Sequence, residues 1–270
     1  MRPGDTVVLG TALEQAIPFA AGHEIVRQGI GELTLVGPIS DILFDQLIGA
    51  GCARAVEAAW VGNVAGGSAY NFRRAVEYGS LEVVDHSNLT LALRLQAAAW
   101  GVPFLPTRSA LGSDLMGNPA LKPFRCPFSG LPLVAVAALR PDVAIVHAQR
   151  CDAQGNAHCL GNLGVTVEAV EASRRVILTV ERVVSEETIC ARPELVRFPS
   201  TKVNAVVELP FGAHPSPLVG YYRRDHQHFL DYHEQSKTPE AFGAWLASWV
   251  TNLACRQDYL DKIDTRGLRP

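Results

Sequence analysis

Leu33-Thr34-Leu35-Val36 is a short apolar run, and it is followed by a segment of helical spacing at 41–48 and by Gly49. The same order of elements recurs around it, with the apolar runs Thr6-Val7-Val8-Leu9 before it and Leu81-Glu82-Val83-Val84 after it. Short strands that alternate with helices form parallel sheets covered by helices. The sequence therefore predicts the α/β class.

Further segments extend this pattern and predict a large, mostly parallel sheet. Near-continuous runs of Val, Ile and Leu, as in strands covered on both faces, occupy 133–136, 143–146, 176–180 and 203–208. Helical spacing is also found at 20–28, 71–77 and 89–100. A glycine that would end the helix follows each of the four helical segments, at Gly29, Gly49, Gly79 and Gly101.

Two segments depart from this alternation within one predicted domain, 1–270. Residues 102–132 hold many prolines and glycines with little periodicity, which predicts a long irregular excursion that serves a site or an interface. The segment 225–263 is predicted to be helical, with an apolar stripe on one face. The stripe consists of Phe242, Trp245, Leu246, Trp249, Val250 and Leu253. Burial in the core is the preferred interpretation and a subunit interface is the alternative.

Composition excludes several classes of function. The chain has 24 Lys and Arg against 27 Asp and Glu, a formal charge of -3, so no basic surface for nucleic acid or an anionic membrane is expected. No apolar run approaches the roughly 20 residues that cross a bilayer, so no membrane association is expected. Met1-Arg2-Pro3-Gly4-Asp5 lacks a signal-peptide pattern, which favours the cytoplasm. The six cysteines form no CxxC pair and are expected to be reduced thiols.

The most localised signal for a ligand site is the loop Gly62-Asn63-Val64-Ala65-Gly66-Gly67-Ser68-Ala69-Tyr70-Asn71. It follows a strand-like run that ends at Trp60 and opens a helix, the edge of an open α/β sheet where ligands bind. Its glycines let the backbone approach a ligand, and amides at a helix N-terminus bind anions. The alternative is a plain turn capped by Ser68 or Asn71. The glycine spacings of nucleotide-binding loops are absent.

Other polar residues give weaker signals. Glu14 and Gln15 lie in the turn after the first strand, where they are either site residues or solvated loop side chains. His214, held beside Pro215, has the chemistry to donate a hydrogen bond or move a proton, although a lone histidine in a turn is more often structural. A solvated helix face is expected for Asp225, His226, His228 and His233.

No complete catalytic or metal-binding set is found in the sequence. Cys151, His158 and Cys159 lack a fourth ligand and the usual pair spacing, so no metal is expected. No GxSxG motif, protease-type cysteine or prominent carboxylate pair is present, so the chain has no evident nucleophile of its own.

Several short motifs occur in a fixed order along nearly the whole chain. They are Glu24-Ile25-Val26-Arg27-Gln28-Gly29, Leu47-Ile48-Gly49-Ala50-Gly51, Ala97-Ala98-Ala99-Trp100-Gly101-Val102-Pro103-Phe104-Leu105-Pro106, Leu133-Val134-Ala135-Val136, Pro141-Asp142-Val143-Ala144-Ile145-Val146-His147-Ala148-Gln149, Asn204-Ala205-Val206-Val207 and Gly212-Ala213-His214-Pro215-Ser216. Together they resemble the alpha subunit of family I coenzyme A transferases, most closely the glutaconate CoA-transferase type. The resemblance implies the fold of that family, a three-layer α/β/α domain shared with sugar-phosphate isomerases.

The resemblance also implies an activity and partners. Family members move CoA between short carboxylic acids, here expected to be dicarboxylic, by a ping-pong mechanism in which a glutamate attacks the acyl-CoA thioester. In two-subunit members that glutamate belongs to the beta subunit, within a glycine-containing motif that has no counterpart here. A beta subunit, an oligomer of heterodimers, and acyl-CoA and carboxylic acid substrates are therefore expected, with CoA as substrate and no bound cofactor.

The resemblance assigns candidate site residues by position. Gly10 matches the first glycine of the family's Gly-Gly-Phe turn, whereas Thr11 and Ala12 depart from its second glycine and phenylalanine. This turn continues into a thioester-side loop with Glu14 and Gln15. The loop corresponding to the substrate-binding stretch contributes Asn63, Gly66, Gly67 and Ser68, and His214 is the one candidate for supporting the chemistry from this chain.

Two alternatives remain open. Relatives with this architecture hydrolyse a ring ketone or decarboxylate an acyl-CoA when the partner lacks its glutamate, and the departures at Thr11 and Ala12 keep that reaction open. The fold is also shared with sugar-phosphate-binding and regulatory modules, and fold alone does not fix function.

Overall fold

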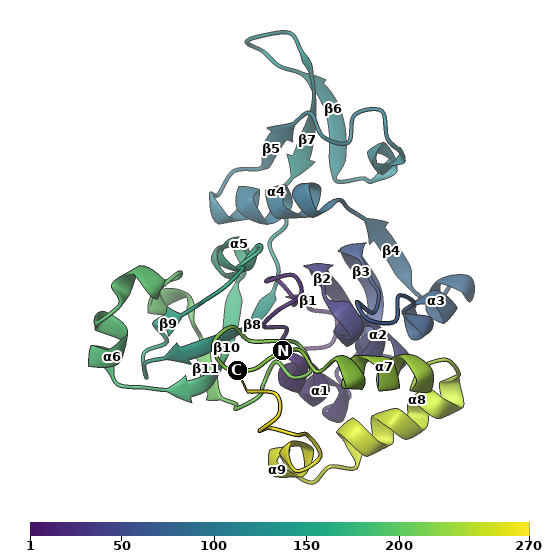
Figure 1. Cartoon of the computed structure of the whole chain (residues 1–270). Coiled ribbons are helices and arrows are strands. Elements are labelled where there is room, and N and C mark those ends of the chain that lie inside the picture. The colour runs from purple at the N-terminus through teal and green to yellow at the C-terminus, as the bar shows by residue number, and fades with distance from the viewer. Residues whose placement is uncertain (270) are drawn as a thin grey trace.

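The computed structural model describes residues 1–269, and strands and helices alternate along them (Figure 1). The strands are β1 (Thr6–Val8), β2 (Leu33–Ile39), β3 (Ala53–Trp60), β4 (Glu82–Asp85), β5 (Phe104–Thr107), β6 (Leu121–Arg125), β7 (Pro132–Ala137), β8 (Val143–Cys151), β9 (Ala157–His158), β10 (Arg175–Val183) and β11 (Ala205–Glu208). The α-helices are α1 (Phe19–Arg27), α2 (Asp41–Gly49), α3 (Tyr70–Glu77), α4 (Asn88–Ala99), α5 (Thr166–Ala172), α6 (Glu186–Cys190), α7 (His226–Gln235), α8 (Pro239–Leu246) and α9 (Arg256–Leu260).

The central sheet confirms the predicted parallel arrangement. Its strand order is β11-β10-β8-β1-β2-β3-β4, every neighbouring pair in this order is parallel, and β9 adds an antiparallel pairing to β8. Because the strands are parallel, their carboxyl ends all lie at one edge of the sheet. The loops that follow β1, β2, β3 and β11 therefore start from the same edge.

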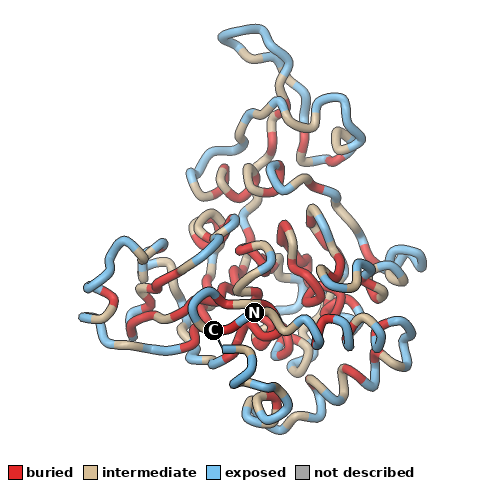
Figure 2. Tube along the Cα trace, viewed as in Figure 1, coloured by how far each residue is buried: buried red, intermediate tan, exposed pale blue. Residues whose placement is uncertain are grey.

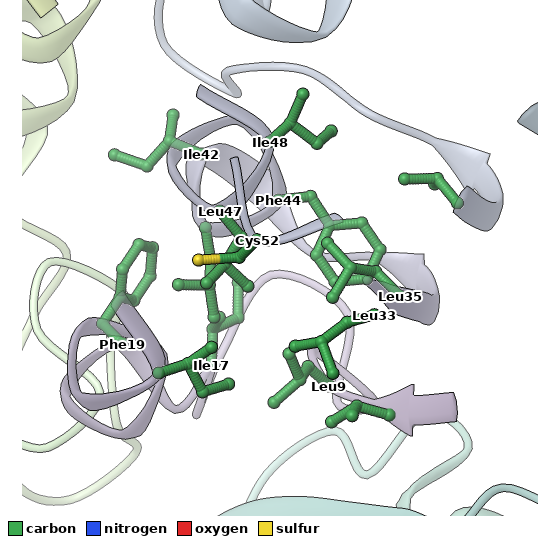
Figure 3. Packing of buried hydrophobic residues seen from close by; sticks show 14 of the residues in the cluster. Leu9, Ile17, Phe19, Leu33, Leu35, Ile42, Phe44, Leu47, Ile48 and Cys52 are labelled. Carbon is green, nitrogen blue, oxygen red and sulfur yellow. The ribbon is translucent and has the colours of Figure 1, made fainter. Parts of the chain in front are cut away.

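Helices cover both faces of this sheet, which gives the predicted three layers (Figure 1). Val7 and Ile145 pack with α1, α2 and α8 on one face, whereas Val8 and Val146 pack with α4 and α5 on the other. Figure 3 shows Phe19 of α1 and Phe44 of α2 within the first of these clusters. Successive strand residues point to opposite faces, so the near-continuous apolar runs follow from burial on both sides.

The prediction of an irregular excursion at 102–132 is wrong, and so is the placement of 133–136 in the central sheet. Strands β5, β7 and β6 form a separate antiparallel sheet in that order, which projects beyond α4 in Figure 1. Val134 and Val136 of β7 are buried with Leu93 of α4 packed against them. Pro106 and Pro123 lie in the two edge strands, where a missing N–H does not break the ladder, so proline content did not exclude strands here.

The predicted helices are present, with one change at their ends. Gly29, Gly79 and Gly101 follow α1, α3 and α4 and have positive φ, as expected of helix C-termini. Gly49 is instead the last residue of α2, and Gly51, two residues later, takes the left-handed conformation with φ 74°.

The C-terminal segment is helical, and its apolar stripe is part of the core. Phe242, Trp245 and Val250 are buried against the α1–α2 face of the sheet, and Leu246 and Trp249 pack on them. A π-helical turn, η4 (Ala247–Thr251), continues α8 and carries Val250 inward. Figure 2 shows buried positions concentrated around the sheet, while the tip of the β6–β7 hairpin is exposed.

Candidate functional site

The loop after β1 is held in a constrained conformation at the carboxyl edge of the sheet. Gly10, Leu13 and Ala16 have positive φ angles of 62°, 61° and 50°. A Cβ on Gly10 would lie 2.3 Å from Ser40 Oγ and 2.8 Å from Ser40 Cα, so glycine is required at this close approach. Three positive-φ residues within one short loop indicate that the surrounding structure fixes its path.

Thr11 anchors the same loop from within. Its hydroxyl lies 2.8 Å from Thr166 Oγ1, and its carbonyl oxygen accepts from Val165 N at 2.8 Å. Neither Thr11 nor Ala12 has a positive φ, so the backbone accommodates a Cβ at both positions where the resembled turn has glycine and phenylalanine.

Asn63 organises the loop after β3 and does not offer a free side chain. Its Nδ2 donates to the carbonyl oxygen of Phe229 at 2.8 Å, and its Oδ1 accepts from the backbone N–H groups of Ala65 and Gly66, each at 2.9 Å. With 1% of its surface exposed, Asn63 shapes the loop from below. Its backbone also pairs with Gly67, whose φ of 86° turns the chain back.

Other residues of this loop differ in accessibility. Ser68 is exposed, and its hydroxyl makes no hydrogen bond within residues 1–269. A Cβ on Gly66 would lie 2.4 Å from His233 Nδ1, so this glycine permits close packing on α7. The capping alternative is wrong, because Ala69 is the N-cap of α3 and no side chain caps it, and Asn71 bonds to Asp45 and Tyr232 instead.

Asp41 is a buried carboxylate at the start of α2, on the same edge. Its φ is 51°, and its Oδ1 accepts from Ile42 N at 3.1 Å and Val64 N at 3.2 Å, so it joins α2 to the loop after β3. Its Oδ2 is buried and has no hydrogen-bond partner. Burial raises the pKa of Asp41 to about 7, although the two backbone N–H groups and Arg224 act against that rise.

The raised pKa of Asp41 predicts a pH-dependent stability. Because the folded pKa lies above the ordinary value, the stabilisation is complete at acid pH and is lost as pH rises through about 7. Asparagine keeps the acceptor at Oδ1 and tolerates a positive φ. We expect the stability of Asp41→Asn relative to the natural protein to increase by about 2–3 kcal/mol between pH 5 and 8. Urea unfolding at both pH values measures this difference, and a constant difference would contradict it.

Arg224 and Glu14 lie beside Asp41. The Nη2 of Arg224 donates to the backbone oxygen of Glu14 at 3.0 Å and to its Oε2 at 3.1 Å. Nη1 of Arg224 lies 3.6 Å from Asp41 Oδ2. One guanidinium thus contacts the loop after β1, the start of α2 and, through Asp41, the loop after β3.

Two glutamines fix the neighbouring segment 160–164. Gln15 donates through Nε2 to the carbonyl oxygen of Asn162. Gln149 accepts from Leu160 N at 3.0 Å and donates to Val219 O at 3.1 Å. Gln15 therefore has a structural role in holding one loop against another.

A second polar network supports the turn after β11. Glu181 accepts from His147 Nε2, Tyr222 Oη and Phe211 N, each at 2.8 Å, and from Gly212 N at 3.2 Å. Burial opposes ionisation, but these hydrogen bonds lower the pKa of Glu181. The carboxylate holds Phe211 in its left-handed conformation, with φ 54°.

His214 is buried, with both ring nitrogens engaged. Nδ1 lies 2.8 Å from Tyr259 Oη and Nε2 lies 3.0 Å from Asp225 Oδ2, and 1% of the residue is exposed. Burial lowers the pKa of His214. This placement fits the structural interpretation of a turn histidine.

The expected solvated face at the start of α7 is wrong in part. His226 is exposed, but His228 packs against Trp245 and Trp249, and burial lowers its pKa to about 3. Asp225 caps α7 by accepting from His228 N.

Two hollows lie away from these loops or beside them. An apolar one of about 540 Å³ lies over β8, β10 and β11 next to α1, and its lining includes Ile145, Ile177 and Val207. Another, of about 520 Å³, is bordered by Glu181, Arg182 and Tyr221. Within residues 1–269, no group of three or more His, Cys, Asp or Glu is placed to hold a metal ion. No helix in this part of the chain is long and apolar enough to cross a membrane.

Comparison with known proteins identifies the family. The model of the family described as coenzyme A transferase matches residues 1–209. The chain belongs to the coenzyme A transferases. It is 40% identical over 267 residues to the first of the two subunits of the 3-oxoadipate CoA-transferase of Pseudomonas knackmussii, covering 97% of this chain and 94% of that protein. The crystal structure of glutaconate coenzyme A-transferase from Acidaminococcus fermentans superposes with a TM-score of 0.96 at 33% identity, covering 100% of this chain and 92% of that chain.

A third relative carries out another reaction. The cholesterol ring-cleaving hydrolase IpdA subunit of Rhodococcus jostii is 30% identical over 268 residues, 93% of this chain and 88% of that protein. The family resemblance seen in the sequence motifs is thereby confirmed, as is the CoA-transferase fold.

Three residues of this CoA-transferase chain were missed by sequence reasoning. Asp41 directly follows the strand β2, and the rule that ligand loops follow parallel strands points to it as much as to Asn63. Arg224 and Glu181 carry no local signal, because their partners Glu14 and His147 are distant in the sequence.

Proposed function

We propose that this chain is the alpha subunit of a heteromeric CoA-transferase that moves CoA between short dicarboxylic acids by a ping-pong mechanism. The observation that carries the proposal is the 40% identity to the corresponding subunit of a 3-oxoadipate CoA-transferase over nearly the full length of both proteins. The partner is a beta subunit that supplies the nucleophilic glutamate, and CoA is a substrate. Its place of action is the cytoplasm, where acyl-CoA thioesters are used.

In this proposal the partner's glutamate does the covalent chemistry. Its carboxylate oxygen attacks the thioester carbonyl carbon, and the CoA thiolate leaves to give an acyl-glutamyl anhydride. The thiolate then attacks the glutamyl carbonyl, which forms the glutamyl-CoA thioester and releases the first carboxylic acid. A second carboxylate reverses these steps, so no redox partner is needed. This chain contributes the wall of the acyl pocket from the loops after β1, β2 and β3.

Ser68 is the side chain proposed to meet the acyl substrate from the loop after β3. It is exposed and unbonded, whereas Asn63 is committed to the loop itself. We expect Ser68→Ala to raise KM about 5- to 20-fold, a loss of one hydrogen bond, with stability unchanged within about 0.5 kcal/mol. Steady-state kinetics of the two-subunit complex measures this, with Ser129→Ala at the exposed hairpin tip as control. Unchanged kinetics with every acid tried would remove Ser68 from the site.

Trapping of the covalent intermediate tests the proposed function. The chain is co-purified with its beta subunit, incubated with a panel of acyl-CoA thioesters, and quenched with borohydride or hydroxylamine. Mass spectrometry is expected to find the modified glutamate on the beta subunit. Modification of Glu14 in this chain would place the nucleophile here and overturn the assignment to the partner.

A hydrolase is the second candidate, favoured by the 30% identity to a ring-cleaving hydrolase subunit. Consumption of acyl-CoA by the complex with no trapped thioester and no CoA transfer to an acceptor acid would support it.

A further inference from the structure

The guanidinium of Arg224 is placed to bind a second carboxylate. Its side chain is 13% exposed and lies between the buried Asp41 and Glu14, whose side chain is 57% exposed. The carbon of the guanidinium also lies 5.4 Å from the centre of the Phe229 ring, which restrains its position. Arg224 is thus a partly buried cation, held from below, with its solvent side covered by a mobile type of side chain.

Glu14 shows that this position accepts a carboxylate. Its Oε2 receives a hydrogen bond from Arg224 Nη2 at 3.1 Å, while its backbone oxygen is held independently at 3.0 Å. The backbone contact keeps the loop in place when the exposed carboxylate turns away. Exposed ion pairs contribute at most about 1 kcal/mol, so an incoming carboxylate displaces Glu14 at small cost.

Asp41 provides an independent indication of a ligand. Its Oδ1 is used by two backbone donors, but its Oδ2 is fully buried without a hydrogen-bond partner and faces Arg224 at 3.6 Å. That separation is too long for a direct hydrogen bond, and one oxygen atom between the two groups would satisfy both. A buried polar atom without a partner is costly, so its retention here calls for a ligand.

We propose that Arg224 and Asp41 form the subsite that binds the far carboxylate of a dicarboxylic acyl substrate, and that Glu14 occupies Arg224 until the substrate arrives. The inference rests on the proposed function, because it names the substrate class of the same site. Arg224 supplies two N–H donors in a planar fork, which suits a carboxylate. Asp41 supplies an O–H donor at Oδ2 when protonated.

The proton on Asp41 couples binding to pH. The charged groups that face Asp41 are Arg224 and, beyond it, Glu14. With Asp41 protonated and Glu14 turned away, the subsite has the charge of Arg224 alone and attracts a carboxylate. Ionised Asp41 would repel it. KM for a dicarboxylic donor is therefore expected to rise as pH increases above about 7.

Donors that differ only at the far end test the subsite. The two-subunit complex is assayed with glutaryl-CoA and with pentanoyl-CoA, each with acetate as acceptor. Arg224→Gln is expected to lower kcat/KM about 100-fold with glutaryl-CoA, the loss of a charge-assisted pair, and less than about threefold with pentanoyl-CoA. Arg223→Gln removes the same charge from the neighbouring exposed position and is expected to change neither. An equal loss with both donors would show that Arg224 only supports the fold and would overturn the inference.

Variants of the two acids give opposite signs. Glu14→Gln removes the competing carboxylate and is expected to lower KM for glutaryl-CoA about 3- to 10-fold. Asp41→Ala is expected to raise that KM at every pH. Asp41→Asn places an N–H donor at the position of Oδ2, so it restores binding and removes the rise of KM above pH 7. A pH profile unchanged by Asp41→Asn would contradict the role of Asp41.

Failure of the proposed function is separable from failure of this inference. If the natural complex transfers CoA from neither donor, the transferase proposal fails. Equilibrium binding of glutarate and of pentanoate to the complex then tests the subsite directly. Selective loss of glutarate binding in Arg224→Gln supports it, and glutarate binding equal in both forms, or absent from the natural complex, overturns it.

Discussion

Replacing Asp45 by alanine is expected to lower the free energy of unfolding by about 3–5 kcal/mol, because three buried donors lose their acceptor. Asp45 is fully buried in α2, and it accepts from Tyr232 Oη at 2.6 Å, from Asn71 Nδ2 at 3.1 Å and from Phe72 N at 2.7 Å. Burial raises the pKa of Asp45. The residue therefore ties α2, α3 and α7 together beneath the candidate site.

Equilibrium urea unfolding at pH 7 measures this effect. Tyr232→Phe removes one of the three donors and keeps the aromatic ring in the core, so it is expected to cost about 1 kcal/mol. A cost for Asp45→Ala no larger than that of Tyr232→Phe would mean that the carboxylate does not hold the three helices together.

Gly10→Ala is expected to destabilise the chain by about 3–5 kcal/mol and to disturb the loop after β1. The left-handed conformation alone costs about 1–2 kcal/mol for alanine. The added Cβ would also lie 2.8 Å from the Cα of Ser40, a backbone atom that cannot move without shifting β2 and α2. Overpacking of this kind adds about 1–3 kcal/mol.

Gly29→Ala is the matched control for this substitution. Gly29 has φ 61°, against 62° for Gly10, but no atom lies within 4 Å of its added Cβ. The difference between the two variants in unfolding free energy isolates the contact with Ser40. Equal costs would show that backbone strain accounts for the whole effect and that the loop after β1 is able to relax.

Much of the fold follows from the order of apolar runs. The runs 6–9, 33–36, 143–146 and 176–180 became central strands because successive side chains pack on opposite helical layers. The run 133–136 has the same composition but is buried on one side only, and composition does not distinguish these two environments. Proline was the other source of error, since it excludes central strands but not edge strands.

The candidate site was predicted at the level of loops and not of side chains. The edge of the sheet follows from parallel topology, which correctly directed attention to the turn at Gly10 and the loop at Asn63. Which polar atoms are free depends on tertiary contacts. Asn63 is committed to Phe229, whereas Asp41 has an oxygen without a partner, and neither fact is visible in the sequence.

The small sheet that projects beyond α4 has a consequence for the behaviour of the protein in concentrated solution. Its two outer strands, β5 and β6, carry the exposed prolines Pro106 and Pro123, and β6 also carries the exposed Lys122. Each outer strand lacks a backbone donor at its proline, and a lysine must lose water before another strand can pair there. A protruding sheet with free edges would otherwise recruit strands from other chains. The same prolines that made this segment look irregular thus protect it against aggregation.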